Sequence, residues 1–137
     1  MTRRLKIGDA SHPKSRFDDV DLTGSRFANV NLKGALFADA ELSRARLVNV
    51  RARRIDLIDA DLKGARLANV SLRTARLSDV DLEGATVRGS SLARATIEDC
   101  DLSGLALEGC SFEGLTIDGL DVSALVAEAL RARDRER

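Results

Sequence analysis

Residues 60–84 read ADLKG-ARLAN-VSLRT-ARLSD-VDLEG, five quintets that each carry Leu at the centre. The same spacing extends outward in both directions, because every fifth residue from Phe17 to Val122 is apolar. Two residues before each centre lies a second series of mostly small residues, such as Ala65, Val70 and Ala75. The other three places in the quintet are mostly polar or Gly. A repeat of five residues therefore organises most of the chain.

A period of five matches neither of the common elements of secondary structure. Around an α-helix, such a stripe would spiral and expose every apolar residue in turn. Along a flat strand, an odd spacing would send successive apolar side chains to opposite faces. The spacing is satisfied if each quintet is a short extended piece followed by a corner. The central residue and the small residue before it then both point inward.

The number of corners per coil follows from the residue two places after each centre. Asp recurs there in every fourth quintet from Asp19 to Asp99, and Asn recurs in every fourth quintet at Asn29, Asn49 and Asn69. Gly occupies several of the corners between them, where a positive φ is expected. A three-sided coil would mix these residue types in one column. We therefore predict four sides and 20 residues per coil, with the coils stacked ~4.8 Å apart.

Several quintets, among them residues 40–44, 60–64 and 80–84, resemble the A(D/N)LXX unit of the pentapeptide repeat proteins. The resemblance extends over most of the chain. It implies an all-β fold, a right-handed four-sided parallel β-helix (solenoid) of about five coils, with Leu and Phe stacked in a central column. It implies little about function, because most members of that family have no established role.

We expect a single domain in three parts, because both open ends of a solenoid need caps. Residues 1–14 lose the consensus but keep Ile7 in register, and we expect them to form an irregular N-terminal cap. Residues 15–122 are expected to form the β-helix, with bulky Leu105, Leu115 and Leu120 closing its far end. Residues 123–137 are expected to form a short helix and a tail, with Ser123 as the N-cap.

One face of the predicted C-terminal helix is apolar and consists of Leu125, Val126, Ala129 and Leu130. Two interpretations remain open. The helix caps the last coil by folding over it, or it also contacts the same helix of a second copy in a homodimer. The resemblance adds to the second interpretation, since some pentapeptide repeat proteins dimerise through such segments.

The residues that enzymes need are scarce in this chain. His12 is the only histidine, which excludes His-based triads and multi-His metal sites. Cys100 and Cys110 take small inward positions on opposite corners of one coil, so we expect buried, inert thiols too far apart for a disulfide. The glycines are corner residues and do not form a phosphate-binding loop. We therefore expect no enzymatic activity, no cofactor and no metal site.

The chain carries 22 Lys plus Arg and 22 Asp plus Glu, so its net charge is zero. Half of the acids are expected to gather along one edge of the prism, which we call the acidic edge. It comprises a corner series, Asp19, Asp39, Asp59, Asp79 and Asp99, and a second series, Asp21, Glu41, Asp61, Asp81, Asp101 and Asp121. The opposite side is expected to carry Arg26, Arg46, Arg51, Arg53, Arg54, Arg66, Arg73 and Arg94, with Lys33, Arg44, Lys63 and Arg88 nearby. The molecule is therefore expected to be strongly dipolar across its width.

Carboxylates stacked ~4.8 Å apart repel one another, so some interaction must offset the repulsion. One explanation is structural: Asp and Asn at the corners accept hydrogen bonds from backbone N–H groups, as in Asx-turns. The other is functional: the acidic edge docks a basic partner. A smaller surface candidate is the outward apolar trio of Leu36, Ala38 and Ile58.

These features favour a non-enzymatic protein-binding or scaffold protein that presents a rigid charged surface to another protein. The alternative, implied by the resemblance, is a DNA-mimicking modulator of DNA gyrase of the quinolone-resistance type. The zero net charge, the Arg-rich side and the lack of loop insertions count against that alternative. Direct nucleic-acid binding is disfavoured by the scarcity of aromatic residues. With no long apolar run and no leader, we expect no membrane association and a cytoplasmic location.

Overall fold

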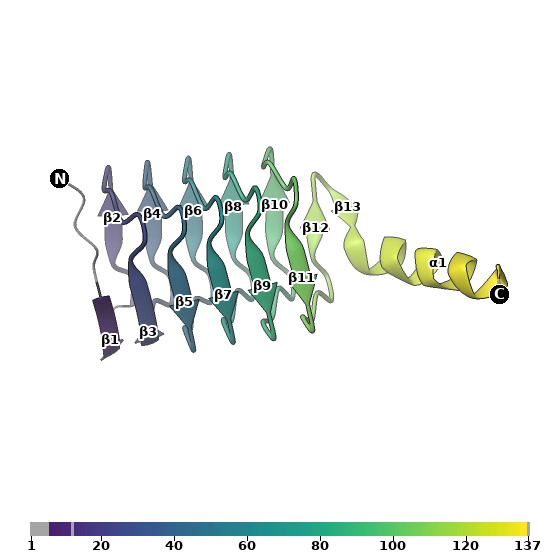
Figure 1. Cartoon of the computed structure of the whole chain (residues 1–137), viewed down its shortest axis with the longest axis horizontal. Helices are drawn as coiled ribbons and strands as arrows, with labels where there is room; N and C mark the ends of the chain where they lie inside the picture. The colour runs from purple at the N-terminus through teal and green to yellow at the C-terminus, as the bar shows by residue number, and fades with distance from the viewer. Residues whose placement is uncertain (1–5, 12, 137) are drawn as a thin grey trace.

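The computed structural model describes residues 6–11 and 13–136. The chain winds into a β-solenoid of about five turns, and one helix continues beyond the last turn (Figure 1). The strands are β1 (Lys6–Ser11), β2 (Arg16–Asp18), β3 (Arg26–Asn31), β4 (Leu36–Ala38), β5 (Arg46–Val48), β6 (Asp56–Ile58), β7 (Arg66–Ala68), β8 (Arg76–Ser78), β9 (Thr86–Arg88), β10 (Thr96–Glu98), β11 (Ala106–Glu108), β12 (Thr116–Ile117) and β13 (Leu120–Asp121), and the helix is α1 (Val122–Arg135). His12 and the first five residues of the predicted N-terminal cap lie outside the described residues.

Two sheets form opposite sides of the solenoid. Their strand orders are β1-β3-β5-β7-β9-β11 and β2-β4-β6-β8-β10-β12-β13, and the pairs are parallel except for the closing β12–β13 pair. Parallel partners lie four quintets apart, as in the pairing of Phe27 with Leu47 and of Leu47 with Leu67. The predicted coil length is therefore confirmed.

The other two sides are narrow ladders of single bridges. One joins Asp21, Glu41, Asp61, Asp81 and Asp101, and the other joins Asn31, Arg51, Ser71, Ser91 and Ser111. Two sheets and two bridge ladders make four sides, as predicted. Each side is one quintet long. A short strand such as β5 is followed directly by a corner, and the next side then begins.

From Asp19 to Gly119, the residue two places after each quintet centre has a positive φ, which turns the chain. Gly34 and Gly64 adopt φ values of 70° and 65°, as expected for glycine corners. Asp39, Asn49 and Arg44 adopt nearly the same conformation, at 51°, 54° and 58°. The ladders on both sides hold the backbone, so the corner geometry is imposed on whichever residue stands there. Among non-glycine residues, Asp and Asn tolerate this conformation best.

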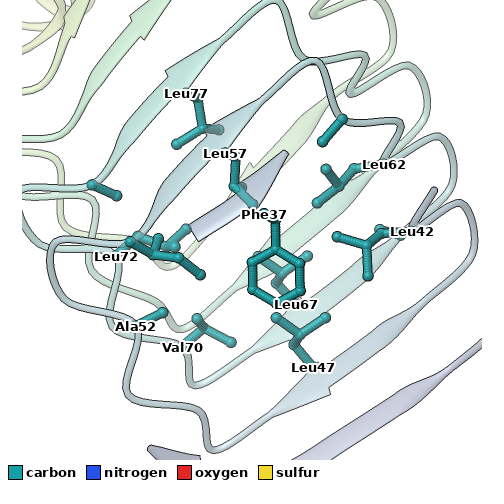
Figure 2. Packing of buried hydrophobic residues seen from close by; sticks show 14 of the residues in the cluster. Phe37, Leu42, Leu47, Ala52, Leu57, Leu62, Leu67, Val70, Leu72 and Leu77 are labelled. Atoms are coloured by element: carbon teal, nitrogen blue, oxygen red, sulfur yellow. The ribbon is translucent and has the colours of Figure 1, made fainter. Parts of the chain in front are cut away.

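The interior is a solid apolar column. Figure 2 shows Leu42, Leu62 and Phe37 directed into the space that the four sides enclose. Phe27 and Leu32 are only 1% and 0% exposed. The rings of Phe17 and Phe37 stack with centroids 4.5 Å apart, and Phe27 meets Phe37 edge-on at 6.3 Å. The predicted central column of Leu and Phe is confirmed.

One pair of core residues departs from the repeat in a compensating way. Ala52 stands at a quintet centre where most quintets have Leu, and Ile55 stands at the small position where Ala is common. Both are buried, with exposures of 0% and 3%, and both line the same small internal cavity. The smaller side chain at position 52 is thus accompanied by a larger one at position 55, beside the small cavity that both residues line.

β1 extends the solenoid at its N-terminal end. It pairs in parallel with β3, and Ile7 lies opposite Phe27, the register that the sequence predicted. Residues 6–11 therefore form a regular strand within the segment for which an irregular cap was expected.

The C-terminal helix is present but differs from the expectation in two respects. Its N-cap is Asp121, whose carboxylate accepts the backbone N–H of Ala124 at 3.3 Å. The predicted N-cap, Ser123, instead donates its hydroxyl to the carbonyl oxygen of Phe112 at 3.0 Å, which ties the first turn to the last coil. Beyond that turn α1 runs away from the solenoid and does not fold over the last coil (Figure 1). No helix in the described part of the chain has the length and apolar character needed to cross a membrane.

Candidate protein-interaction surface

The structure brings both predicted acidic series to one edge. The second series forms a bridge ladder from Asp21 to Asp101, so consecutive carboxylates are one coil apart. The corner series precedes it by two residues, at the turns that follow β2, β4, β6, β8 and β10. Between the two columns runs a shallow groove lined by Asp39, Ala40, Glu41, Asp59, Ala60, Asp61, Asp79 and Asp81. Asp121, the last member of the second series, serves as the N-cap of α1.

The second series makes Asx-turns. The carboxylates of Asp61, Asp81 and Asp101 each accept the backbone N–H two residues on, at 2.9, 3.0 and 2.9 Å. Asp21 accepts the backbone N–H of Thr23 at 3.0 Å and the Thr23 hydroxyl at 2.6 Å. These donors offset part of the repulsion between stacked carboxylates.

The corner series does not make Asx-turns, which were one of the two explanations considered for its stacked carboxylates. Within the described residues, the side chains of Asp39, Asp59 and Asp79 accept no hydrogen bond. Their backbones adopt φ values of 51°, 52° and 54°. Asp is suited to these corners because it tolerates the left-handed conformation, which glycine would otherwise supply. The sequence pattern alone could not tell which of two Asp residues, two positions apart, reaches the backbone donor.

Hydrogen bonds keep both ends of this ladder ionised. The hydroxyl and the backbone N–H of Thr23 lower the pKa of Asp21 below its ordinary value. The backbone N–H and the side chain of Ser103 lower the pKa of Asp101 in the same way. Both carboxylates are exposed at the surface.

One cation lies on the acidic edge itself. The Nζ atom of Lys63 is 3.5 Å from Oδ2 of Asp81 in the next coil, and the attraction of Asp81 raises the pKa of Lys63. From the repeat alone, Lys63 is expected near the Arg-rich side. That placement was wrong, because position 63 belongs to the same side of the coil as Asp61.

Asp81, Glu83 and Asp101 bring carboxylate oxygens within 4.8 Å of one another. Hard cations such as Ca²⁺ take about six to eight oxygen ligands, and this cluster offers three side chains on an open surface. Asp81 and Asp101 are also engaged in Asx-turns. Asp81 and Asp101 belong to the acidic edge, and Glu83 lies beside them on the same surface.

The opposite half of the solenoid is basic. Residues 25–34, 45–54, 65–74 and 85–94 contain ten Lys or Arg and no Asp or Glu. We call these four segments the arginine side. They build strands β3, β5, β7 and β9 and the bridge ladder that follows them. Arg26, Arg46 and Arg66 are consecutive partners in the strand register, so the charges are separated across the width of the molecule as expected.

The arginine side also carries an amide ladder. Asn49 donates its side-chain N–H to Oδ1 of Asn29 at 3.2 Å, and Asn69 donates to Oδ1 of Asn49 at 3.3 Å. The sequence located this Asn series, but the side chains bond to one another and not to the corner backbone. Further along the same sheet, Glu108 accepts the Nε–H of Arg88 at 2.7 Å.

Both cysteines are free thiols. They are half-buried and not fully buried as expected, because the coils near the C-terminal end are less completely covered. The thiol of Cys100 donates to the carbonyl oxygen of Glu98 at 3.2 Å, and that of Cys110 donates to the carbonyl oxygen of Val87 at 3.3 Å. Burial raises the pKa of Cys100, which keeps its thiol protonated at neutral pH.

Exposed apolar side chains gather at the C-terminal end. Leu120, Leu125 and Leu130 are 60%, 52% and 45% exposed. The predicted helix face also contains half-buried Val126 and exposed Ala129, and no described residue of α1 is fully buried. Most of this face of the helix is therefore exposed to solvent.

The outward apolar trio is a small patch on the sheet that contains β4 and β6. Ala38 and Ile58 are partners in the strand register, and Leu36 lies opposite Asp56. Of the three, Ile58 alone is exposed, at 40%. Single exposed apolar side chains such as Ile58 are common on protein surfaces and do not by themselves mark an interface.

Comparisons with known proteins agree with this architecture. The family model of the pentapeptide repeat region matches residues 20–97. A solved pentapeptide repeat protein from the thylakoid lumen of Arabidopsis thaliana superposes with a TM-score of 0.61 at 21% identity, covering 66% of this chain and 63% of that one. The chain thus spans less than two thirds of that protein's length, and the likeness concerns the fold alone.

Two further solved structures are similar over a larger share of the chain. Rfr23, a pentapeptide repeat protein from the cyanobacterium Cyanothece 51142, has a TM-score of 0.42 at 20% identity, with 82% of this chain and 91% of that one covered. A trypsin-treated variant of QnrB1, a plasmid-mediated fluoroquinolone resistance protein, has a TM-score of 0.26 at 15% identity, with 93% and 97% covered. TM-scores this low carry no argument about function. No curated protein sequence matches the chain.

Proposed function

Because the chain belongs to the pentapeptide repeat family, we propose that it is a non-enzymatic scaffold that binds another protein through its acidic edge. The observation that carries this proposal is the stack of two carboxylate columns on one edge of the solenoid, from Asp19 to Asp101. The partner that fits such an edge presents a row of Lys or Arg side chains.

The acidic edge is preorganised for binding. Backbone hydrogen bonds tie each coil to its neighbours along this edge: the N–H of Leu42 donates to the carbonyl of Asp61 at 2.7 Å, and the N–H of Asp61 donates to the carbonyl of Ala40 at 3.0 Å. The Asx-turns hold the second series in place as well. Little conformational entropy is lost when a partner docks, which favours affinity.

The charge distribution supports a basic partner. Carboxylates in one column repel one another, and a cation placed between two of them relieves the repulsion. Lys63 makes such a contact within the chain, 3.5 Å from Asp81. A partner Lys or Arg beside Asp39 or Asp59 would repeat that contact. The opposed electrostatic fields would also speed the encounter.

Substitution of the groove carboxylates tests the proposal. The variant Asp39→Asn, Asp59→Asn, Asp61→Asn and Asp81→Asn removes four charges but keeps an oxygen acceptor at both Asx-turn positions. We expect its far-ultraviolet circular dichroism to match the wild type. Proteins captured from a lysate by the wild-type chain and identified by mass spectrometry are expected to be lost.

A second variant controls for net charge. Glu113→Gln, Glu128→Gln, Asp134→Asn and Glu136→Gln neutralise four exposed acids that lie away from the groove. This control is expected to capture the same proteins as the wild type. Equal capture by the groove variant and the control would contradict docking at the acidic edge.

The same edge supports a second candidate function, a DNA-mimicking modulator of DNA gyrase. Two parallel columns of carboxylates at the coil spacing of ~4.8 Å form a regular polyanion. The arginine side counts against this candidate, since duplex DNA is anionic all round. A supercoiling assay with purified gyrase, with and without a fluoroquinolone, decides the matter. Altered supercoiling or altered drug inhibition supports the candidate, and unchanged behaviour in both arms removes it.

We also propose a homodimer through the C-terminal segment. The support is the exposure of Leu125 and Leu130 on α1, together with exposed Leu120 at its base. Light scattering after size-exclusion chromatography is expected to give a dimer mass for the wild type and a monomer mass for Leu125→Glu with Leu130→Glu. Ala127→Glu, on the same helix, is the matched control and is expected to leave the dimer intact. A wild-type monomer at high protein concentration would rule the homodimer out.

A further inference from the structure

Repulsion between stacked like charges is offset differently in the two charged halves of the solenoid. On the acidic edge, backbone N–H groups donate to stacked carboxylates such as Asp61 and Asp81. On the arginine side, Arg26, Arg46 and Arg66 are consecutive strand partners and form no ion pair with any described residue. Like charges in one column of a sheet repel. The arginine column lacks internal compensation and therefore favours an anion from solution.

A hollow of about 500 Å³ lies over this column. It is lined by Arg46, Val48, Arg66, Leu67, Ala68, Thr86 and Arg88. Thr86 is the strand partner that follows Arg66, so a short side chain stands where a further Arg would continue the column. The guanidinium groups of the lining arginines border the hollow, and apolar side chains such as Val48 and Ala68 lie between these groups.

We propose that this hollow binds an oligophosphate group, either free or carried by a nucleotide. Guanidinium groups bind phosphate oxygens through two parallel N–H donors. Successive coils are ~4.8 Å apart, so Arg46 and Arg66 can contact different phosphoryl groups of one chain. The hydroxyl of Thr86 adds a neutral donor at the end of the column.

The neighbouring acid occupies one guanidinium group of the lining. Glu108 accepts the Nε–H of Arg88 at 2.7 Å, which leaves Arg46 and Arg66 as the guanidinium groups that contact the ligand. The lining contains no carboxylate, thiol or imidazole, so the site binds its ligand without converting it. The proposed site lies on the arginine side and does not depend on docking at the acidic edge.

Isothermal titration calorimetry of the full chain with sodium tripolyphosphate, in about 0.15 M NaCl, tests the inference. ATP is the second titrant and a short DNA duplex is the third. The wild type is expected to bind tripolyphosphate, and Arg46→Gln with Arg66→Gln is expected to weaken binding by about tenfold or more. Thermal melts of the variant are expected to match those of the wild type.

The matched control is Arg53→Gln with Arg73→Gln. These residues are also exposed and one coil apart, but they lie on the adjacent side and outside the hollow. The control removes the same charge and is expected to change the affinity by less than about threefold. Similar affinity for ATP and tripolyphosphate supports recognition of the phosphate chain, and tighter ATP binding supports a nucleotide as its carrier. Equal weakening by both double variants, binding of the duplex alone, or no binding of tripolyphosphate overturns the inference.

Discussion

Asp61 and Asp81 lie one coil apart on backbones joined by a parallel β-bridge, and each carboxylate accepts the backbone N–H two residues further on, at 2.9 and 3.0 Å. Each side chain therefore closes a turn within its own coil while it faces a like charge in the next. Asn retains the oxygen acceptor and removes the charge. Asp-to-Asn substitutions along this column therefore remove the negative charge while they preserve the hydrogen bond that closes the turn.

The first prediction concerns acid stability. Hydrogen bonds from Ser103 lower the folded-state pKa of Asp101 below its ordinary value of 3.8. Stability gained from this ionised carboxylate is present above that value and is lost as the pH falls through the lower, folded-state pKa. Asp101→Asn is expected to reduce the fall in melting temperature between pH 5 and pH 2, since Asn is not protonated in this range. Circular dichroism melts across that range measure the effect, and an unchanged pH dependence would contradict it.

The second prediction separates two costs of a side chain at a glycine corner. Gly84 has a φ of 69° and open space where a Cβ would stand, so Gly84→Ala is expected to cost about 1–2 kcal/mol from the backbone conformation alone. At Gly89, with a φ of 56°, a Cβ would lie 3.0 Å from Oδ1 of Asn69. Gly89→Ala is therefore expected to cost about 0.5–1.5 kcal/mol more, because the side chain of Asn69 must shift and its hydrogen bond to Asn49 is weakened.

Urea unfolding of the two alanine variants measures this difference. Gly84→Asn serves as the control, because Asn tolerates a positive φ and is expected to cost less than Ala at the same position. Equal midpoints for Gly84→Ala and Gly89→Ala would show that the Asn69 contact does not matter.

The third prediction tests the volume exchange in the core. Ala52→Leu overfills a closed interior and is expected to cost about 1–3 kcal/mol. Ile55→Ala leaves a cavity and is expected to cost about 2–5 kcal/mol. The double variant restores the common Leu and Ala arrangement, so its loss is expected to fall below the sum by about 0.5–3 kcal/mol. A denaturant-based double-mutant cycle measures the coupling, and strict additivity would mean that the two sites repack independently.

The fourth prediction concerns the helix N-cap. Asp121→Ala removes the acceptor for the backbone N–H of Ala124 and is expected to destabilise α1 by about 0.5–2 kcal/mol. Since α1 has no fully buried residue among those described, this loss is expected to appear as a smaller ellipticity at 222 nm. Asp121→Asn keeps the acceptor and is the control that should retain the signal. If both variants give the wild-type spectrum, Asp121 does not act as the cap.

Stacking partners could be predicted from the repeat alone. Once each coil is known to hold four quintets, the column through Asp21, Glu41 and Asp61 follows directly, and so does the burial of Leu42 and Leu62. These features depend only on spacing along the chain, which a uniform backbone ladder converts into position in space. The identity of a binding partner does not follow from spacing, because binding also depends on the surface of the partner.

The predictions that failed concern where side chains point and which groups they contact. Asp59 and Asp61 share one edge, yet only Asp61 closes an Asx-turn, because the backbone N–H within reach of a side chain depends on the local φ and ψ. Lys63 lies with the acids because it precedes the corner at Gly64 and so stays on the same side of the coil as Asp61. Ser123 bonds to Phe112 instead of capping α1 because the last coil brings that carbonyl beside it.

By itself, the sequence determined the coil, its four sides, its apolar column and the two opposed bands of charge, because a period of five residues directs the central Leu and Phe inward only if each quintet ends in a corner. Only the tertiary structure decided which carboxylates are held by the backbone, where Lys63 lies, and that α1 extends the solenoid. Those features are set by corner dihedral angles and by contacts between coils, which a linear pattern of residue types does not encode.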